Sequence, residues 1–141
     1  MAKISVGRLI LGGIVAGIVG DILDVPFDGF WLSKMWSNQL SALGHSAYTG
    51  SQLILFDLAG IVVGLVAIWI YAGILPRFGP GVKTAICVGI AVWILAFLVP
   101  NFTFMWVSHL FSGQLALDTT IGNLVECVVG AIAGAAVYKE A

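Results

Sequence analysis

The chain has 141 residues, of which 60% are hydrophobic and only 9% are charged, and its formal net charge is −1. Soluble domains are roughly 45 to 50% apolar and about 25% charged, so this composition excludes a soluble domain and predicts an integral membrane protein. The six lysines and arginines are scattered and form no basic patch, which argues against nucleic acid as a partner.

Four apolar stretches are each long enough to cross a bilayer, which takes about 20 helical residues. They are residues 4–23, 52–75, 82–99 and 118–138. With short connections they use the whole chain, so we expect residues 1–141 to form one all-α domain, a bundle of four transmembrane helices. The first stretch follows Lys3 and Arg8 as a signal peptide would, but it lacks a small-residue cleavage site, and we expect it to be retained.

Two connections contain apolar segments that do not cross the bilayer by themselves. Residues 27–43 mix aromatic and polar side chains at helical intervals, which predicts an interfacial helix between spans 1 and 2. Residues 102–111 follow Pro100, where the third span is expected to stop, and predict a short interfacial or re-entrant piece between spans 3 and 4. The tryptophans of these segments are expected to be interfacial anchors: Trp31, Trp36 and Trp106.

The remaining boundaries are marked by turn and capping residues. Residues 76–81 include two prolines and two glycines, which predict a turn between the second and third spans. Asp118 opens the fourth span, where a carboxylate would cap the free amides of the first helical turn.

The basic residues predict an orientation. Five of them flank the spans on one side, namely Lys3, Arg8, Arg77, Lys83 and Lys139. Lys34 alone falls on the other side. By the positive-inside rule, both termini are expected in the cytoplasm, with the protein integral to a bacterial-type cytoplasmic (inner) membrane.

The fourth span carries an acid inside an apolar helix. Gly122, Glu126, Gly130 and Gly134 recur every four residues and therefore share one face. Glu126 is expected near the middle of the bilayer, at a depth where no lysine or arginine is placed. A desolvated carboxylate without a counter-ion tends to hold a proton, and this is the main mechanistic expectation from the sequence.

Two further acids lie beside glycines in predicted spans. Asp21 ends a glycine stripe of the first span, and Asp57 lies next to glycines of the second. Glu126, Asp57 and Asp21 are therefore candidates for a proton or cation site. The alternative is that Asp21 is hydrated at the interface, and that Glu126 is a neutral acid bonded to a backbone carbonyl or to Asn123.

A metal site is weighed and not predicted. Asp21, Asp24 and Asp28 offer oxygen ligands to calcium, but their spacing matches no EF-hand loop, so we expect a solvated outer rim. His45 and His109 fall in loops or interfacial pieces, where we expect them to bind neither haem nor a transition metal. No cofactor is predicted.

The glycines predict close helix packing within or between protomers. Small residues four apart let membrane helices approach closely. The glycines concerned are Gly13, Gly17, Gly60, Gly64, Gly130 and Gly134. The sequence contains neither a glycine-rich phosphate loop nor a nucleophile elbow, and we expect no enzymatic activity.

Parts of the sequence resemble three kinds of small membrane protein, and two of these resemblances fail at the residues that matter for function in those families. Leu-Gly-Gly at residues 11–13 resembles the opening of small multidrug resistance transporters, but Gly17 and Ile18 occupy the region of that family's glutamate. The same glycines resemble those of small fluoride channels, but Asp21 has the opposite sign to that family's arginine. Residues 71–85, with the tryptophan-bearing third span, resemble bacterial four-span membrane proteins of unassigned function, which implies a fold and no mechanism.

These features lead to two main hypotheses of function. The first is a structural or accessory subunit that self-associates or docks on a larger membrane complex. The second is a small proton- or cation-linked transporter or channel in which Glu126 carries the proton and Asp57 and Asp21 form the outer path. A further alternative is haem, quinone or lipid binding. In that case the flat contact surfaces would come from Trp31, Trp36, Trp93 and Trp106.

Overall fold

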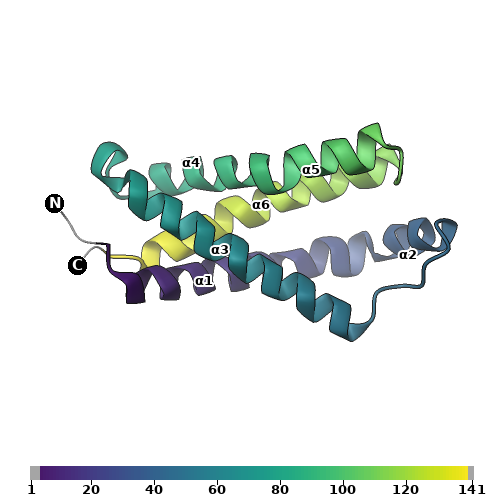
Figure 1. The fold of residues 1–141 in the computed structure, drawn as a ribbon, viewed down its shortest axis with the longest axis horizontal. Coiled ribbons are helices and arrows are strands. Elements are labelled where there is room, and N and C mark those ends of the chain that lie inside the picture. The colour runs from purple at the N-terminus through teal and green to yellow at the C-terminus, as the bar shows by residue number, and fades with distance from the viewer. Residues whose placement is uncertain (1–3, 140–141) are drawn as a thin grey trace.

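The structure is a computed structural model that describes residues 4–139. Lys3, one of the basic residues that predict the orientation, lies outside the described residues. The predicted fold class is confirmed: the chain is all-helical, and four helices are long and apolar enough to cross a membrane. They are Val6–Trp31, Gly50–Phe78, Val82–Val107 and Gly113–Val137. Figure 1 shows them running along one axis, with the start of the first and the end of the last at the same end of the bundle.

The first long helix extends beyond its predicted end at residue 23. It consists of α1 (Val6–Asp24) and the π-helical segment η1 (Val25–Trp31). Pro26 has no N–H and would clash with the carbonyl four residues before it in a regular α-helix. The wider π turn absorbs this defect, and the N–H of Leu32 bonds to the carbonyl of Phe27 at 2.8 Å. Residues 27–31 therefore belong to the first long helix and not to a separate interfacial helix.

A shorter helix, α2 (Ser33–Ala42), lies at the far end of the bundle from the start of α1 (Figure 1). Leu32, just before it, is 1% exposed and packs in a cluster with Met105 and Leu115. Gln39 accepts a hydrogen bond at its Oε1 from the backbone N–H of Ser112, at 3.1 Å. These contacts attach α2 to the third and fourth long helices.

The second long helix is α3 (Gly50–Phe78), and it also runs past its predicted end. It begins at a capping box made by Thr49 and Gln52, and it includes Pro76 in its last turn. Gly79, with φ of 75°, and Gly81, with φ of 134°, make the turn that follows. Both are backbone conformations that favour glycine.

The third long helix does not stop at Pro100. It consists of α4 (Val82–Trp93), η2 (Ile94–Leu98), α5 (Val99–Asn101) and η3 (Phe102–Val107). π-helical segments flank Pro100 on both sides and absorb it in the same way as at Pro26. Residues 102–107, expected in an interfacial or re-entrant piece, therefore continue the third helix, and the following connection is short.

The fourth long helix, α6 (Gly113–Val137), begins earlier than expected. Ser112 is its N-cap, and the Ser112 side chain accepts a hydrogen bond from the backbone N–H of Leu115 at 3.3 Å. Asp118, predicted to be the N-cap, lies inside the helix and accepts hydrogen bonds from Gln114 at 2.9 Å. With this start, Glu126 falls near the midpoint of α6.

Glycines allow α1 to cross α3 closely. A Cβ atom added at Gly17 would lie 2.5 Å from the Cα of Ile61, and one added at Gly64 would overlap the backbone of Gly13 and Gly17. A Cβ at Gly13 would lie 2.6 Å from the Cα of Leu65. The two backbones therefore touch where the helices cross.

An adjacent face of α1 packs in the same manner on α6. A Cβ at Gly134 would lie 2.5 Å from the carbonyl oxygen of Gly12, and one at Gly130 would lie 2.6 Å from that of Ala16. α1 thus packs on both α3 and α6, which also contact each other. The glycine faces identified in the sequence meet one another within a single chain.

Candidate ion-binding site

Glu126 lies on the face of α6 that packs against the first long helix. One turn earlier, Gly122 faces the Phe27 ring, so that an added Cβ would lie 3.5 Å from the ring, and one turn later Gly130 faces the backbone of Ala16. The helices are therefore close on both sides of Glu126, and its side chain is only 8% exposed. The glycine and acid stripe of the sequence faces one partner helix along its length.

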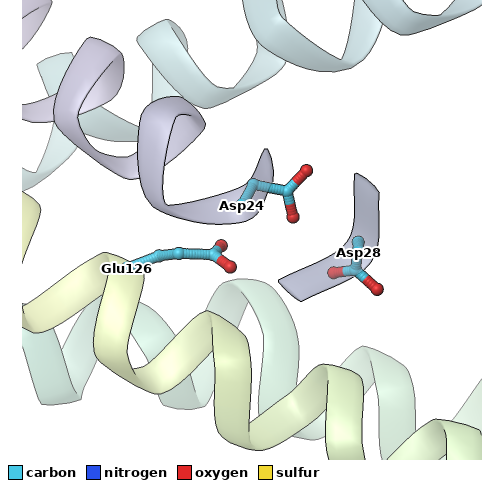
Figure 2. Close-up of side chains that lie close together, drawn as sticks. All are labelled: Asp24, Asp28 and Glu126. Atoms are coloured by element: carbon cyan, nitrogen blue, oxygen red, sulfur yellow. The ribbon is translucent and has the colours of Figure 1, made fainter. Parts of the chain in front are cut away.

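Two carboxylates of the first long helix meet Glu126. Asp24 is the last residue of α1 and Asp28 lies one turn further on, in η1. One carboxylate oxygen from each of the three acids lies within 4.8 Å of the other two. Figure 2 shows the Glu126 side chain extending from α6 toward the segment that carries Asp24 and Asp28. Asp24 and Asp28 are half-buried.

Asp28 is held in place by hydrogen bonds from two other helices. The indole Nε1 of Trp36, in α2, donates to Oδ1 of Asp28 at 2.6 Å. The hydroxyl of Thr119, in α6, donates to the same oxygen at 3.2 Å. Trp36 was predicted as an interfacial anchor, and the structure shows that its polar edge also orients an acid of the cluster.

The two oxygens of Glu126 differ in their surroundings. Oε2 accepts a hydrogen bond from the side-chain amide of Asn123 at 3.1 Å. Oε1 is buried and has no hydrogen-bond partner among residues 4–139. Leaving a buried polar atom unsatisfied costs about 1 to 3 kcal/mol, and more for a charged group. The structure therefore carries an unsatisfied carboxylate oxygen beside two other acids.

A polar network joins Glu126 to the third long helix. The side-chain amide of Asn101 donates to Oδ1 of Asn123 at 3.3 Å and to the hydroxyl of Thr120 at 3.1 Å. The indole of Trp93 donates to the carbonyl of Thr120 at 2.8 Å. Sequence reasoning missed Asn101 because Pro100 was expected to end the helix, which would have left this amide in a connection.

The three acids proposed from sequence do not meet in one group of ligand atoms, although Asp21 lies close enough to interact electrostatically with both Asp57 and Glu126. Asp57 is exposed on α3. Asp21 lies on α1 with its carboxylate against Gly60 of α3, where an added Cβ would overlap Oδ1 of Asp21. Neither joins the group around Glu126. The two acids whose ligand atoms do meet Glu126 are Asp24 and Asp28, which were expected in a solvated rim. Their four-residue spacing, equal to that of the stripe on α6, was the available signal.

Within the part of the chain that the structure describes, no basic side chain pairs with the acids of this cluster. Among the described lysines and arginines, all but one lie toward the end of the bundle where α1 begins: Arg8, Arg77, Lys83 and Lys139 (Figure 1). Lys34, in α2, is exposed, and within residues 4–139 no ion pair involves the three acids. His45 and His109 are exposed in connections and belong to no ligand group of the described chain. Three carboxylates in such a setting can bind a cation or share a proton.

Within the described residues, the protein is all-helical and has four potential membrane spans. Three carboxylates meet where the first of these spans packs against the fourth. Comparison of the chain with protein-family models, with curated proteins and with solved structures found no match.

Proposed function

We propose that the chain is a small cation- or proton-linked transporter or channel, and that Asp24, Asp28 and Glu126 form its ion site. The observation that carries the proposal is that Glu126, whose buried Oε1 has no hydrogen-bond partner, brings its carboxylate together with two more carboxylates inside potential membrane spans. Acids this close repel one another in a medium of low dielectric constant. A cation or a proton in the space between them removes that penalty.

The other two acids are assigned to the approach to this site. Asp57 is exposed on α3, and Asp21 lies where α3 crosses α1. In the proposal they attract cations toward Glu126 from the outer side. The orientation follows from the positive-inside rule, which puts the end with Arg8, Arg77 and Lys83 in the cytoplasm of a bacterial-type inner membrane.

Flux measurements in liposomes test the transport function. The purified full chain, reconstituted in liposomes that contain a pH-sensitive or cation-sensitive dye, is expected to dissipate an imposed gradient faster than empty liposomes do. Glu126→Gln and Asp24→Asn each remove a negative charge from the cluster, and we expect the flux to fall at least about tenfold, the scale of losing one charged ligand.

The matched control is Asp118→Asn, which makes the same chemical change on α6. Asp118 bonds to Gln114 on its own helix and is not part of the cluster. This variant should keep the wild-type flux. Wild-type flux in Glu126→Gln would show that the cluster is not on the ion path.

The exposed start of α3 supports a second candidate function, a structural or accessory subunit that self-associates or docks on a larger membrane complex. Every residue from 50 to 59 is exposed, so this part of the helix packs on little else in the chain. It includes Asp57, and a carboxylate within a membrane span costs roughly 2.5 to 3.5 kcal/mol. A neighbouring subunit that donates a hydrogen bond to Asp57 would lower this cost. The glycine faces already pack against one another within the chain, so they are not available to bind a partner.

Purification in a mild detergent tests the second candidate. The wild-type chain should elute with a second copy or another membrane protein at fixed stoichiometry, measured by light scattering and mass spectrometry. Asp57→Leu removes the carboxylate and is expected to release the partner. Trp69→Leu changes another exposed side chain of the same helix, with 61% exposure, and should leave the assembly intact. A monomeric wild-type protein would contradict the accessory role.

A further inference from the structure

We infer that the ion held by Asp24, Asp28 and Glu126 is a divalent cation of about the size of calcium. One oxygen of each carboxylate binds it directly, and water completes its coordination. The inference rests on the proposed function, because it uses the same three residues, and it deepens that function by naming the class of ion. It differs from the interpretation of the sequence, which treated Asp24 and Asp28 as a solvated rim separate from Glu126.

The net charge of the cluster favours a divalent ion. Three ionised carboxylates bring three negative charges, and no lysine or arginine within residues 4–139 pairs with them. A monovalent cation would leave two of these charges uncompensated beside the buried Glu126, whereas a divalent cation would leave one. Buried charges are tolerated where they are paired or bound to a metal, so the larger charge on the ion is preferred.

The ligand atoms and their spacing indicate the kind of divalent ion. All three ligands are carboxylate oxygens, the donors that hard cations prefer, while no histidine or cysteine of the described chain joins the group, as zinc sites usually require. Calcium binds oxygen at 2.3 to 2.6 Å, so two ligands of one calcium ion lie at most about 5 Å apart. The 4.8 Å limit of this cluster fits that span. Magnesium binds in a strict octahedron and gives up its water reluctantly, so proteins usually hold it by one or two carboxylates and not by three.

The hydrogen bonds around the cluster leave oxygens available to the ion. Trp36 and Thr119 both donate to Oδ1 of Asp28, so these two bonds fix that carboxylate without using Oδ2. The Asp24 and Asp28 carboxyl groups are close enough to share a hydrogen bond, which a cation between them would replace. Asn123 likewise donates to Oε2 of Glu126 and leaves Oε1 buried and unpaired. This unsatisfied oxygen is the observation, independent of the clustering of acids, that points to a ligand. Asp24 and Asp28 are only half-buried, so protein atoms do not enclose the remaining coordination positions.

Binding to the purified full chain in detergent tests the inference directly. After treatment with a chelator and removal of that chelator, calcium chloride is added, and binding is followed by calorimetry and by the melting temperature. We expect one calcium ion per chain and a rise in melting temperature, because a ligand that binds only the folded state stabilises it. Magnesium at the same concentration should raise the melting temperature much less, and sodium should not raise it.

Three variants locate the site. Glu126→Gln, Asp28→Asn and Asp24→Asn should each weaken calcium binding at least tenfold, while Asp118→Asn should bind as the wild type does. Using three separate variants keeps the test valid if one of them does not fold. Absence of calcium binding to the wild type would overturn the inference, and so would magnesium binding as tight as calcium binding or wild-type affinity in all three variants.

The binding and flux experiments can fail separately. Proton flux that depends on Glu126, without calcium binding, would overturn the divalent-ion inference and leave the proposed transport function standing. Calcium binding that depends on the three acids, without any flux, would support the inference and contradict the transport function.

Discussion

Replacing Glu126 with glutamine is expected to make the metal-free protein more stable while it weakens ion binding and flux. In the wild-type chain Oε1 is buried without a hydrogen-bond partner, and the Glu126 carboxylate lies near those of Asp24 and Asp28. A glutamine amide removes a negative charge, and its NH₂ group can donate to those carboxylates, while its carbonyl still accepts from Asn123. Satisfying a buried polar atom is worth about 1 to 3 kcal/mol, which sets the expected gain in unfolding free energy.

The measurement is reversible unfolding in detergent with chelator present, for the wild type, Glu126→Gln and the control Asp118→Asn. Adding calcium should reverse the order, because it stabilises only chains that bind it. A residue kept for function at the expense of stability shows this behaviour. If Glu126 served only to pack α6 against the first long helix, glutamine would be neutral or destabilising under both conditions, and the ion-site proposal would lose its main support.

The second large effect is expected at the crossing of α1 and α3. Gly64→Ala puts a methyl group where the backbone of Gly13 and Gly17 already lies, and a backbone cannot move aside as the tip of a flexible side chain can. Overpacking of this kind costs roughly 1 to 3 kcal/mol. Since α1 carries Asp24 and leads directly into η1, a shift of this helix should also weaken the ion site.

Gly73→Ala is the matched control, because it makes the same substitution on α3 at a position with no atom within 4 Å of the added methyl group. Alanine is a better helix former than glycine, so this variant should be neutral or more stable by up to about 1 kcal/mol. Unfolding in detergent, compared with the wild type, measures both. Equal stability of Gly64→Ala and Gly73→Ala would show that the backbones do not meet at this crossing.

The combination of these two features explains how the ion site is built. Backbone contact at the glycines sets the distance between α1 and α6, and the same close approach encloses Glu126 between Gly122 and Gly130. The π-helical turns at Pro26 then carry Asp28 past the end of α1 and toward Thr119 on α6. The acids converge because the helices bearing them are packed by small residues.

The sequence alone determined the number of long helices, their approximate extent and the face of α6 that carries Glu126. These properties depend on local composition and on the helical period, which are read within one segment. The four-residue spacing of Gly122, Glu126 and Gly130 predicts a common helix face, and this prediction does not depend on which helix packs against it. Hydropathy likewise identified four potential spans, and the structure has four helices of that kind.

Only the tertiary structure decided that two helices continue past a proline, and which acids meet. A proline normally interrupts an α-helix, but π turns at Pro26 and Pro100 let both helices continue, and the stability of such turns depends on packing against neighbours. The partners of Glu126 depend on which helix α6 packs against and at what height. That choice comes from contacts between segments far apart in the chain, so Asp24 and Asp28, and not Asp21 and Asp57, complete the cluster.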